Sequence, residues 1–165
     1  KISKAQHIRA GHRLLSFNPD KASTGVVLVK SASPVILPRL HGFFRGVVQG
    51  QMISPIVEIE LRNQKMEVMR VHVCEDQLMW CASSGTAGWA TCASGVPSPA
   101  GGLAMQLRAG HLLVQRDGTA CAVVAIKQPS RSEPVEWGFI RLTLGGSGTL
   151  FLNGFLSHCG HGLHL

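Results

Sequence analysis

The sequence predicts an all-β protein, and three observations carry this prediction. The chain has 165 residues, of which 45% are hydrophobic and only 15% are charged. Its 19 Gly and 8 Pro are scattered along the whole length, which favours many short strands joined by turns over long amphipathic helices or disorder. The third observation is a duplication, because QHIRAGHRLL at 6–15 returns as MQLRAGHLLV at 105–114. A repeat this widely spaced indicates two pseudo-symmetric halves of one small domain, since solenoid and propeller repeats are shorter.

The first copy and its surroundings predict an entry turn followed by short strands. Gly11 and its counterpart Gly110 are expected to permit a tight turn with positive φ, and His12 and His111 are expected either to cap these turns or to lie at the solvent edge. Strands are predicted at 14–17 and 25–30, on either side of the turn residues at 18–20. Two prolines, at 34 and 38, interrupt the next apolar stretch, so 35–40 is expected to be at most an edge strand, and 42–50 a loop.

The most regular alternation lies in PIVEIELRN at 55–63. Val57, Ile59 and Leu61 share one face of the predicted strand, whereas the other face carries Ile56 and then charged residues at every second position. After a short turn, MEVMRVHV at 66–73 alternates in a similar way and continues into CEDQLMW at 74–80. These two segments are therefore predicted to form a hairpin.

From 82 to 102 the composition changes to Ser, Gly, Ala, Thr and Pro, which predicts a long surface connection that tolerates insertions. The second copy is expected to begin with one helical turn at Ala104. Strands are then predicted at 112–115, 121–126, 137–144 and 149–156. The predicted organisation is one domain of 1–165, with a first half at about 1–81, the connection at about 82–102, a second half at about 103–159 and a tail at 160–165.

Charge and cysteine content exclude several classes of function. The net charge of +7 comes from basic residues spread singly along the chain, without an RNA-binding aromatic signature or zinc-finger spacing, so no nucleic-acid partner is predicted. A basic β-barrel that binds RNA or an acidic surface rests on charge alone, and strong salt sensitivity would reveal it. The five Cys are an odd set without CxxC pairs, which predicts neither a disulfide framework nor a structural zinc site.

The C-terminal segment SHCGHGLH is rich in metal-ligating residues, yet its spacing is too tight and Gly-rich for a recognised site. We therefore predict no metal and no cofactor. The sequence contains neither an apolar stretch long enough to span a membrane nor a signal peptide.

Four segments are similar to three motifs of one protein family. IRAGHRLL and LRAGHLLV stand where that family has an element of the form ΦxxGDxΦΦ, with His in place of Asp. FIRLTLGGSGTLFLNGFLSHC at 139–159 resembles its hedgehog-type ending, and VHVCEDQLMWCASSG at 71–85 resembles its central Thr-x-x-His motif. The chain, except for its expected beginning, thus resembles the Hint family, the shared fold of inteins and of the autoprocessing half of hedgehog proteins. This resemblance implies a compact disc of two pseudo-two-fold related β-hairpin units.

The resemblance also assigns a candidate catalytic site. Cys74 falls in the Thr position and Gln77 in the His position of the central motif, while His158 and Cys159 match the terminal residues of the family. In that family the first residue, Cys or Ser, attacks the carbonyl before it, and the Thr and His polarise the scissile peptide and protonate its nitrogen. Gln77 can donate a hydrogen bond but cannot exchange a proton near neutral pH. Cys159 has no side-chain amide, so splicing by Asn cyclisation is disfavoured.

The function implied by the resemblance is autoprocessing of the peptide bond to the chain's own upstream polypeptide, by an acyl shift and transesterification through a thioester. The nucleophile is expected ahead of Lys1, so the chain as it stands is expected to be inactive. By the hedgehog analogy the acceptor is a sterol or another small nucleophile and the compartment the secretory pathway; we expect a monomer. The alternative is a catalytically dead Hint-fold module with a binding or structural role, which the losses at Cys74 and Gln77 favour.

Overall fold

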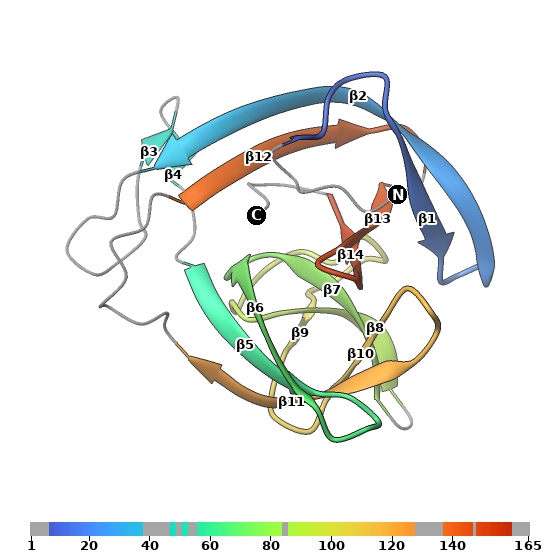
Figure 1. The fold of residues 1–165 in the computed structure, drawn as a ribbon, viewed down its shortest axis with the longest axis vertical. Helices are drawn as coiled ribbons and strands as arrows, with labels where there is room; N and C mark the ends of the chain where they lie inside the picture. The colour runs from blue at the N-terminus through green and yellow to red at the C-terminus, as the bar shows by residue number, and fades with distance from the viewer. Residues whose placement is uncertain are drawn as a thin grey trace.

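A computed structural model of the chain consists of strands joined by turns and loops (Figure 1). The structure describes residues 7–37, 47–48, 51–52, 56–83, 86–127, 137–146 and 148–159. Within these ranges there is no α-helix, which confirms the all-β prediction.

Two sheets make up most of the described chain. The smaller has the order β1-β2-β12, with β1 (Arg13–Asn18), β2 (Ser23–Leu37) and β12 (Trp137–Leu144). The larger has the order β13-β14-β7-β10-β11-β5-β6, with β8 and β9 added beside β7. Its strands are β5 (Ile56–Arg62), β6 (Val68–Cys74), β7 (Leu78–Ser83), β8 (Thr86–Thr91), β9 (Met105–Gln106), β10 (Leu112–Val114), β11 (Ala120–Lys127), β13 (Thr149–Leu152) and β14 (Phe155–His158). A short separate pair is formed by β3 (Val47–Val48) and β4 (Gln51–Met52).

The duplicated segment forms the same turn twice. Gly11 and Gly110 have φ values of +89° and +92°, which glycine adopts without the steric cost that other residues meet. The Gly11 N–H donates to the carbonyl of Val29 and the Gly110 N–H to that of Val123, both at 2.8 Å. Val29 is therefore the structural counterpart of Val123. The similarity of VVLVK at 26–30 to VVAIK at 123–127 would pair Val26 with Val123, which is wrong by three residues.

The two histidines of the repeat cap these turns, as predicted. His12 Nδ1 accepts a hydrogen bond from the backbone N–H of Arg9 at 3.2 Å, and His111 Nδ1 accepts one from Arg108 at 3.1 Å. A ring nitrogen thus serves as the acceptor where the ΦxxGDxΦΦ element has an Asp carboxylate.

The second strand of each repeated hairpin leaves its own half of the chain. β2 pairs with β1 up to Leu28 and with β12 from Val29 onward, with a bulge at Lys30. β11 pairs with β10 at 120–122 and with β5 from Ala122 onward, with a bulge at Val124. Lys30 and Val124 follow the equivalent residues Val29 and Val123, so even the bulge is repeated. Each half therefore contributes a strand to the sheet of the other, and Figure 1 shows β2 and β12 as one long curved ribbon pair.

Four of the predicted elements need correction. β2 continues through Pro34, which pairs with Ile140, whereas a break was expected there. Pairing with β1 has ended by Leu28, so among the described residues Pro34 has a neighbouring strand, β12, on one side only, which is the edge position that tolerates proline in a sheet.

The segment predicted as a surface connection contains β8, which pairs with β7 and buries Trp89, Ala90 and Thr91. Its small residues have low β propensity, but packing against an interior strand overrides propensity. The helical turn expected at Ala104 is also wrong, because Met105 begins β9, which lies parallel to β8.

The strand predicted at 149–156 is a hairpin of two strands. Asn153 and Gly154, with φ values of +52° and +83°, form its two-residue turn, and Leu152 pairs with Phe155 across it. Asn-Gly between apolar residues is a strong hairpin signal, so the sequence does contain the evidence for this turn.

The two larger apolar clusters of the described residues hold the sheets. The larger includes Val57, Ile59 and Leu61, as the alternation predicted; Ile56, expected on the polar face, is also buried. The second cluster lies against the β1-β2-β12 sheet and is made of Ile8, Val27, Val29, Leu142, Leu150 and Leu152. The N-terminal entry at 1–6, most of the loop predicted at 42–50, the loop at 128–134 and the tail at 160–165 lie outside the described residues. The predicted domain boundaries stay a prediction.

Candidate functional site

The central motif occupies the tight turn between β6 and β7. The Gln77 N–H donates to the Cys74 carbonyl at 2.9 Å and closes a four-residue turn with these two residues at its ends. Both side chains are buried. The turn is also tied to the end of β8, because the Glu75 carbonyl accepts hydrogen bonds from the Thr91 hydroxyl at 2.7 Å and the Ala93 N–H at 2.9 Å.

The terminal motif meets the central motif through Gln77. β14 pairs with β7, so that His158 lies opposite Leu78, the residue after Gln77. The Gln77 amide nitrogen Nε2 donates to the Leu78 carbonyl at 3.0 Å and to the His158 carbonyl at 3.2 Å. The second of these carbonyls belongs to the peptide bond between His158 and Cys159. Two predicted site residues that are 81 positions apart in sequence are thus in direct contact.

The His158 imidazole has a defined environment. The Trp89 ring lies edge-to-face against it, with a centroid distance of 5.4 Å and an interplanar angle of 71°, and Trp80 packs in turn against Trp89 at 5.2 Å. On another side is Gly148, where a Cβ atom would come within 3.1 Å of His158 Nε2. Gly148 also accepts a hydrogen bond from the Cys159 N–H at 2.8 Å. Backbone and ring of His158 are therefore both held.

Neither predicted cysteine is an activated nucleophile. Burial, with a smaller contribution from the Asp76 charge, raises the pKa of the Cys74 thiol far above its usual value. Burial raises the pKa of the Cys159 thiol to about 12. Because the thiolate is the reactive form, both side chains are unreactive thiols at neutral pH.

The described chain begins beside the place where it ends. Ile8, the second described residue, is buried in the same apolar cluster that Cys159 packs against. Residues before His7, where the site was expected to meet the start of the chain, lie outside the described structure. The catalytic roles of Cys74, Gln77, His158 and Cys159 therefore remain predictions, although Gln77 and His158 are in contact.

Sequence reasoning missed three residues around the site. Trp89 and Thr91 were assigned to a surface connection, and Gly148 to a spacer between strands. A Trp inside a stretch of small residues was the available signal, since aromatic side chains of that size are usually packed.

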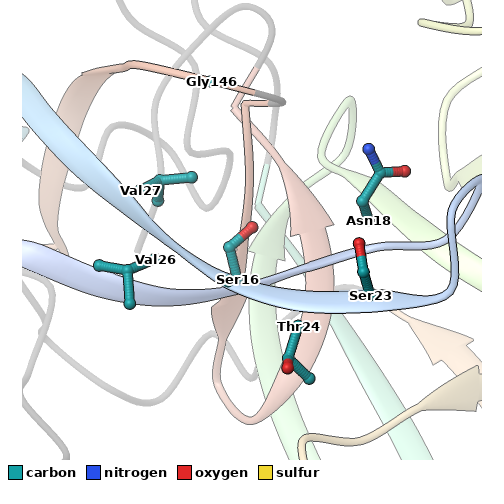
Figure 2. Close-up of a pocket in the computed structure, with 8 residues that line it drawn as sticks. Ser16, Asn18, Ser23, Thr24, Val26, Val27 and Gly146 are labelled. Carbon is teal, nitrogen blue, oxygen red and sulfur yellow. The ribbon is translucent and has the colours of Figure 1, made fainter.

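A shallow pocket of about 130 Å³ lies between the β1–β2 hairpin and Gly146 (Figure 2). Ser16, Asn18 and Ser23 line its polar part, but the Ser16 hydroxyl already donates to the Thr149 carbonyl at 2.7 Å. None of the four predicted site residues lines this pocket.

Metal and membrane features can be stated for the described part of the chain. Among those residues no group of three or more His, Cys, Asp and Glu is placed to hold a metal ion; the predicted tail lies outside them. No helix there is long and apolar enough to cross a membrane.

No protein-family model matches the sequence, and no curated protein matches it. Solved structures do match. The solution structure of the bacterial intein-like domain from Clostridium thermocellum aligns with a TM-score of 0.53 and 15% identity, over 93% of this chain and 86% of that one. The crystal structure of the gp41-1 intein gives a TM-score of 0.51 and 14% identity, over 94% and 86%. The crystal structure of the Ssp DnaB mini-intein variant M86 gives 0.52 and 9%, over 93% and 81%.

At these identities the likeness establishes the fold. The chain has a compact all-β fold of the Hint type, as the sequence resemblance implied. These neighbours are inteins and an intein-like domain, so the hedgehog-type features expected from the sequence stay predictions.

Proposed function

We propose that this chain is an autoprocessing Hint-type module that acts on the peptide bond joining it to its own upstream polypeptide. The observation that supports it most strongly is the hydrogen bond from Gln77 Nε2 to the His158 carbonyl, because it unites the central and terminal motifs within a Hint-type fold. A fold of this type alone is compatible with many functions, so the contact between the two motifs is what adds chemistry.

The reaction is an acyl shift followed by transesterification. A Cys or Ser ahead of Lys1 attacks the carbonyl that precedes it, and the resulting thioester or ester passes to an acceptor nucleophile. Gln77 contributes an amide donor at the position where the family polarises the scissile peptide. Cys74 closes the turn that holds Gln77 and contributes packing, since its buried thiol is a weak donor.

The finer parts of the proposal come from the hedgehog-type ending. The acceptor is then a sterol or another small nucleophile, and the module works as a monomer without a cofactor.

A fusion protein tests the proposal. A reporter domain followed by Cys is joined ahead of Lys1, and cleavage induced by a small thiol is followed by gel electrophoresis and mass spectrometry. We expect slow release of the reporter as a thioester product, and no release when the added Cys is replaced by Ala. A folded fusion that forms no thioester over several days contradicts the proposal.

One set of observations favours a second candidate, a catalytically dead Hint-fold binding or structural module. Gln77 hydrogen-bonds two backbone carbonyls, Cys74 is buried, and the partly buried Cys159 packs against an apolar cluster. Hydrogen bonding to backbone carbonyls and burial against apolar side chains are contributions to the stability of the fold, and neither requires catalysis. The same fusion experiment separates the two candidates.

A further inference from the structure

We propose that His158 moves the proton in this reaction, in place of the residue at position 77, and that Trp89 and Gly148 are the residues that position its ring. This inference rests on the proposed function and adds to it the identity of the acid and base.

The acyl shift needs a proton carrier. The nucleophile's S–C bond forms, the scissile C–N bond breaks, and the proton of the thiol must arrive on the departing nitrogen. Atoms and charge balance without any co-reactant if one imidazole accepts the thiol proton and then gives a proton to the nitrogen. The Gln77 amide cannot take part in such an exchange near neutral pH.

Among the described residues, His72 adjoins the central motif in sequence and His158 contacts it, and the structure distinguishes these two imidazoles. His72 lies two residues before Cys74, but its Nε2 is 3.2 Å from Glu58 Oε1, in a group of ion pairs that also includes Lys127. Its partners place it on the charged face of the β5–β6 hairpin. That face lies opposite the strand residues Val57, Ile59 and Leu61, which are buried in the core.

His158 instead lies at the contact between the two motifs. The backbone carbonyl of His158 accepts the Gln77 hydrogen bond, so Gln77 fixes the backbone of the residue whose imidazole we propose as the proton carrier. The imidazole is partly buried, which excludes part of the water that would otherwise compete for its proton. His12 and His111 use their Nδ1 atoms as acceptors within the repeated turns.

The ring of His158 is positioned from two directions. Trp89 packs against it edge-to-face, and Gly148 leaves room that any side chain would fill, since a Cβ atom there would lie 3.1 Å from Nε2. Proton transfer depends on this placement, because it requires hydrogen-bond distance to the moving proton. Neither Trp89 nor Gly148 carries a group that exchanges protons, so their part is to orient the ring.

The test uses the fusion with Cys ahead of Lys1 and measures the first-order rate constant of thioester formation. His158→Ala should lower this rate constant by about 10² or more, the range in which general acid–base groups act. Added imidazole should restore part of the rate in His158→Ala, an effect that a purely structural residue would not show. His72→Ala is the matched control and should stay within about twofold of the parent.

The positioning residues have their own comparison. Trp89→Leu should lower the rate constant by about tenfold, whereas Trp89→Phe, which keeps an aromatic ring, should retain most of it. Gly148→Ala should displace the ring, and the displacement is seen directly as a change in the His158 ring-proton signals by NMR.

The outcomes separate the two proposals. If the folded parent fusion forms no thioester, the proposed function and the role of His158 both fall. If the parent reacts and His158→Ala reacts equally fast, only the role of His158 is overturned. A slow but folded His158→Ala that imidazole does not rescue also overturns it, and His158→Gln provides the same comparison where the Ala variant fails to fold.

Discussion

Replacing Gln77 by His and Cys74 by Thr restores the central motif, and we expect the double variant to process its upstream bond faster than the parent. An imidazole at position 77 can protonate the departing nitrogen, which the amide cannot do. A gain of about 10² in rate constant corresponds to a barrier lower by about 2.7 kcal/mol.

The structure indicates what these changes do to stability. Gln77 donates from one nitrogen to two carbonyls, at 3.0 and 3.2 Å, whereas a neutral imidazole has a single N–H. At least one of those carbonyls therefore loses its Gln77 donor, at a cost of about 1–3 kcal/mol. A hydroxyl at position 74, where the side chain is 2% exposed, adds about 1–3 kcal/mol if it finds no partner. The sum is a large part of the ~5–15 kcal/mol by which domains are stable, so rates should be compared at low temperature.

The assay compares four proteins: the parent fusion, each single variant and the double variant. Rate constants come from mass spectrometry, and the free energy of unfolding comes from urea titration of the same samples. The two changes should be non-additive in rate because both groups act on one peptide bond. In the double variant, His158→Ala should matter much less than in the parent, since the imidazole introduced at position 77 then carries the proton. A folded double variant that is no faster than the parent would refute the reasoning about position 77.

Three further outcomes follow from the fold. Ala90→Asp, in the segment that composition suggests is tolerant, should unfold the protein, because it buries a carboxylate in β8; an unchanged urea midpoint would contradict that strand. His111→Ala should lower the free energy of unfolding by about 0.5–1.5 kcal/mol through the lost Arg108 hydrogen bond, while His111→Asp should preserve it; equal losses would show that the ring is not a cap. The Cys74 and Cys159 thiols have raised pKa values in the folded chain. Above about pH 9 the folded chain therefore keeps these protons, whereas the unfolded chain loses them. The thermal midpoint should therefore fall between about pH 9 and 11, and Cys74→Ala should reduce the slope; a slope that the substitution leaves unchanged would argue against this assignment.

The sequence predicted what is encoded locally. Alternation placed Val57, Ile59 and Leu61 on the buried face, because side-chain direction in a strand depends only on position. The repeated Gly and His predicted the two turns for the same reason, since positive φ and capping are properties of a few adjacent residues. Asn153-Gly154 is equally local, and overlooking it merged two strands into one.

What could not be predicted depends on partners that are distant in sequence. Trp89 lies in a segment of low β propensity and becomes a strand residue because Trp80 and the rest of β7 pair with it. The contact from Gln77 to His158 follows from β7 pairing with β14, which no pattern within either strand specifies. Sequence resemblance placed both residues in one site, but it did not indicate which carbonyl the amide would bind.

The exchange of strands between the halves has a consequence for the timing of biosynthesis. β2 cannot complete its pairing until β12 has been synthesised, and β5 cannot pair with β11 until β11 has been synthesised. Pairings between distant parts of the chain thus dominate the fold, and topologies of this kind fold slowly. During synthesis, a chain that has reached β11 already contains the Gln77 turn but lacks the strand that supplies its acceptor carbonyl. His158 ends the last described strand, and the partners of its ring come from β8 and the loop before β13. A ribosome-bound intermediate therefore cannot assemble the proposed site, and we expect the proposed processing to start only after translation has passed His158.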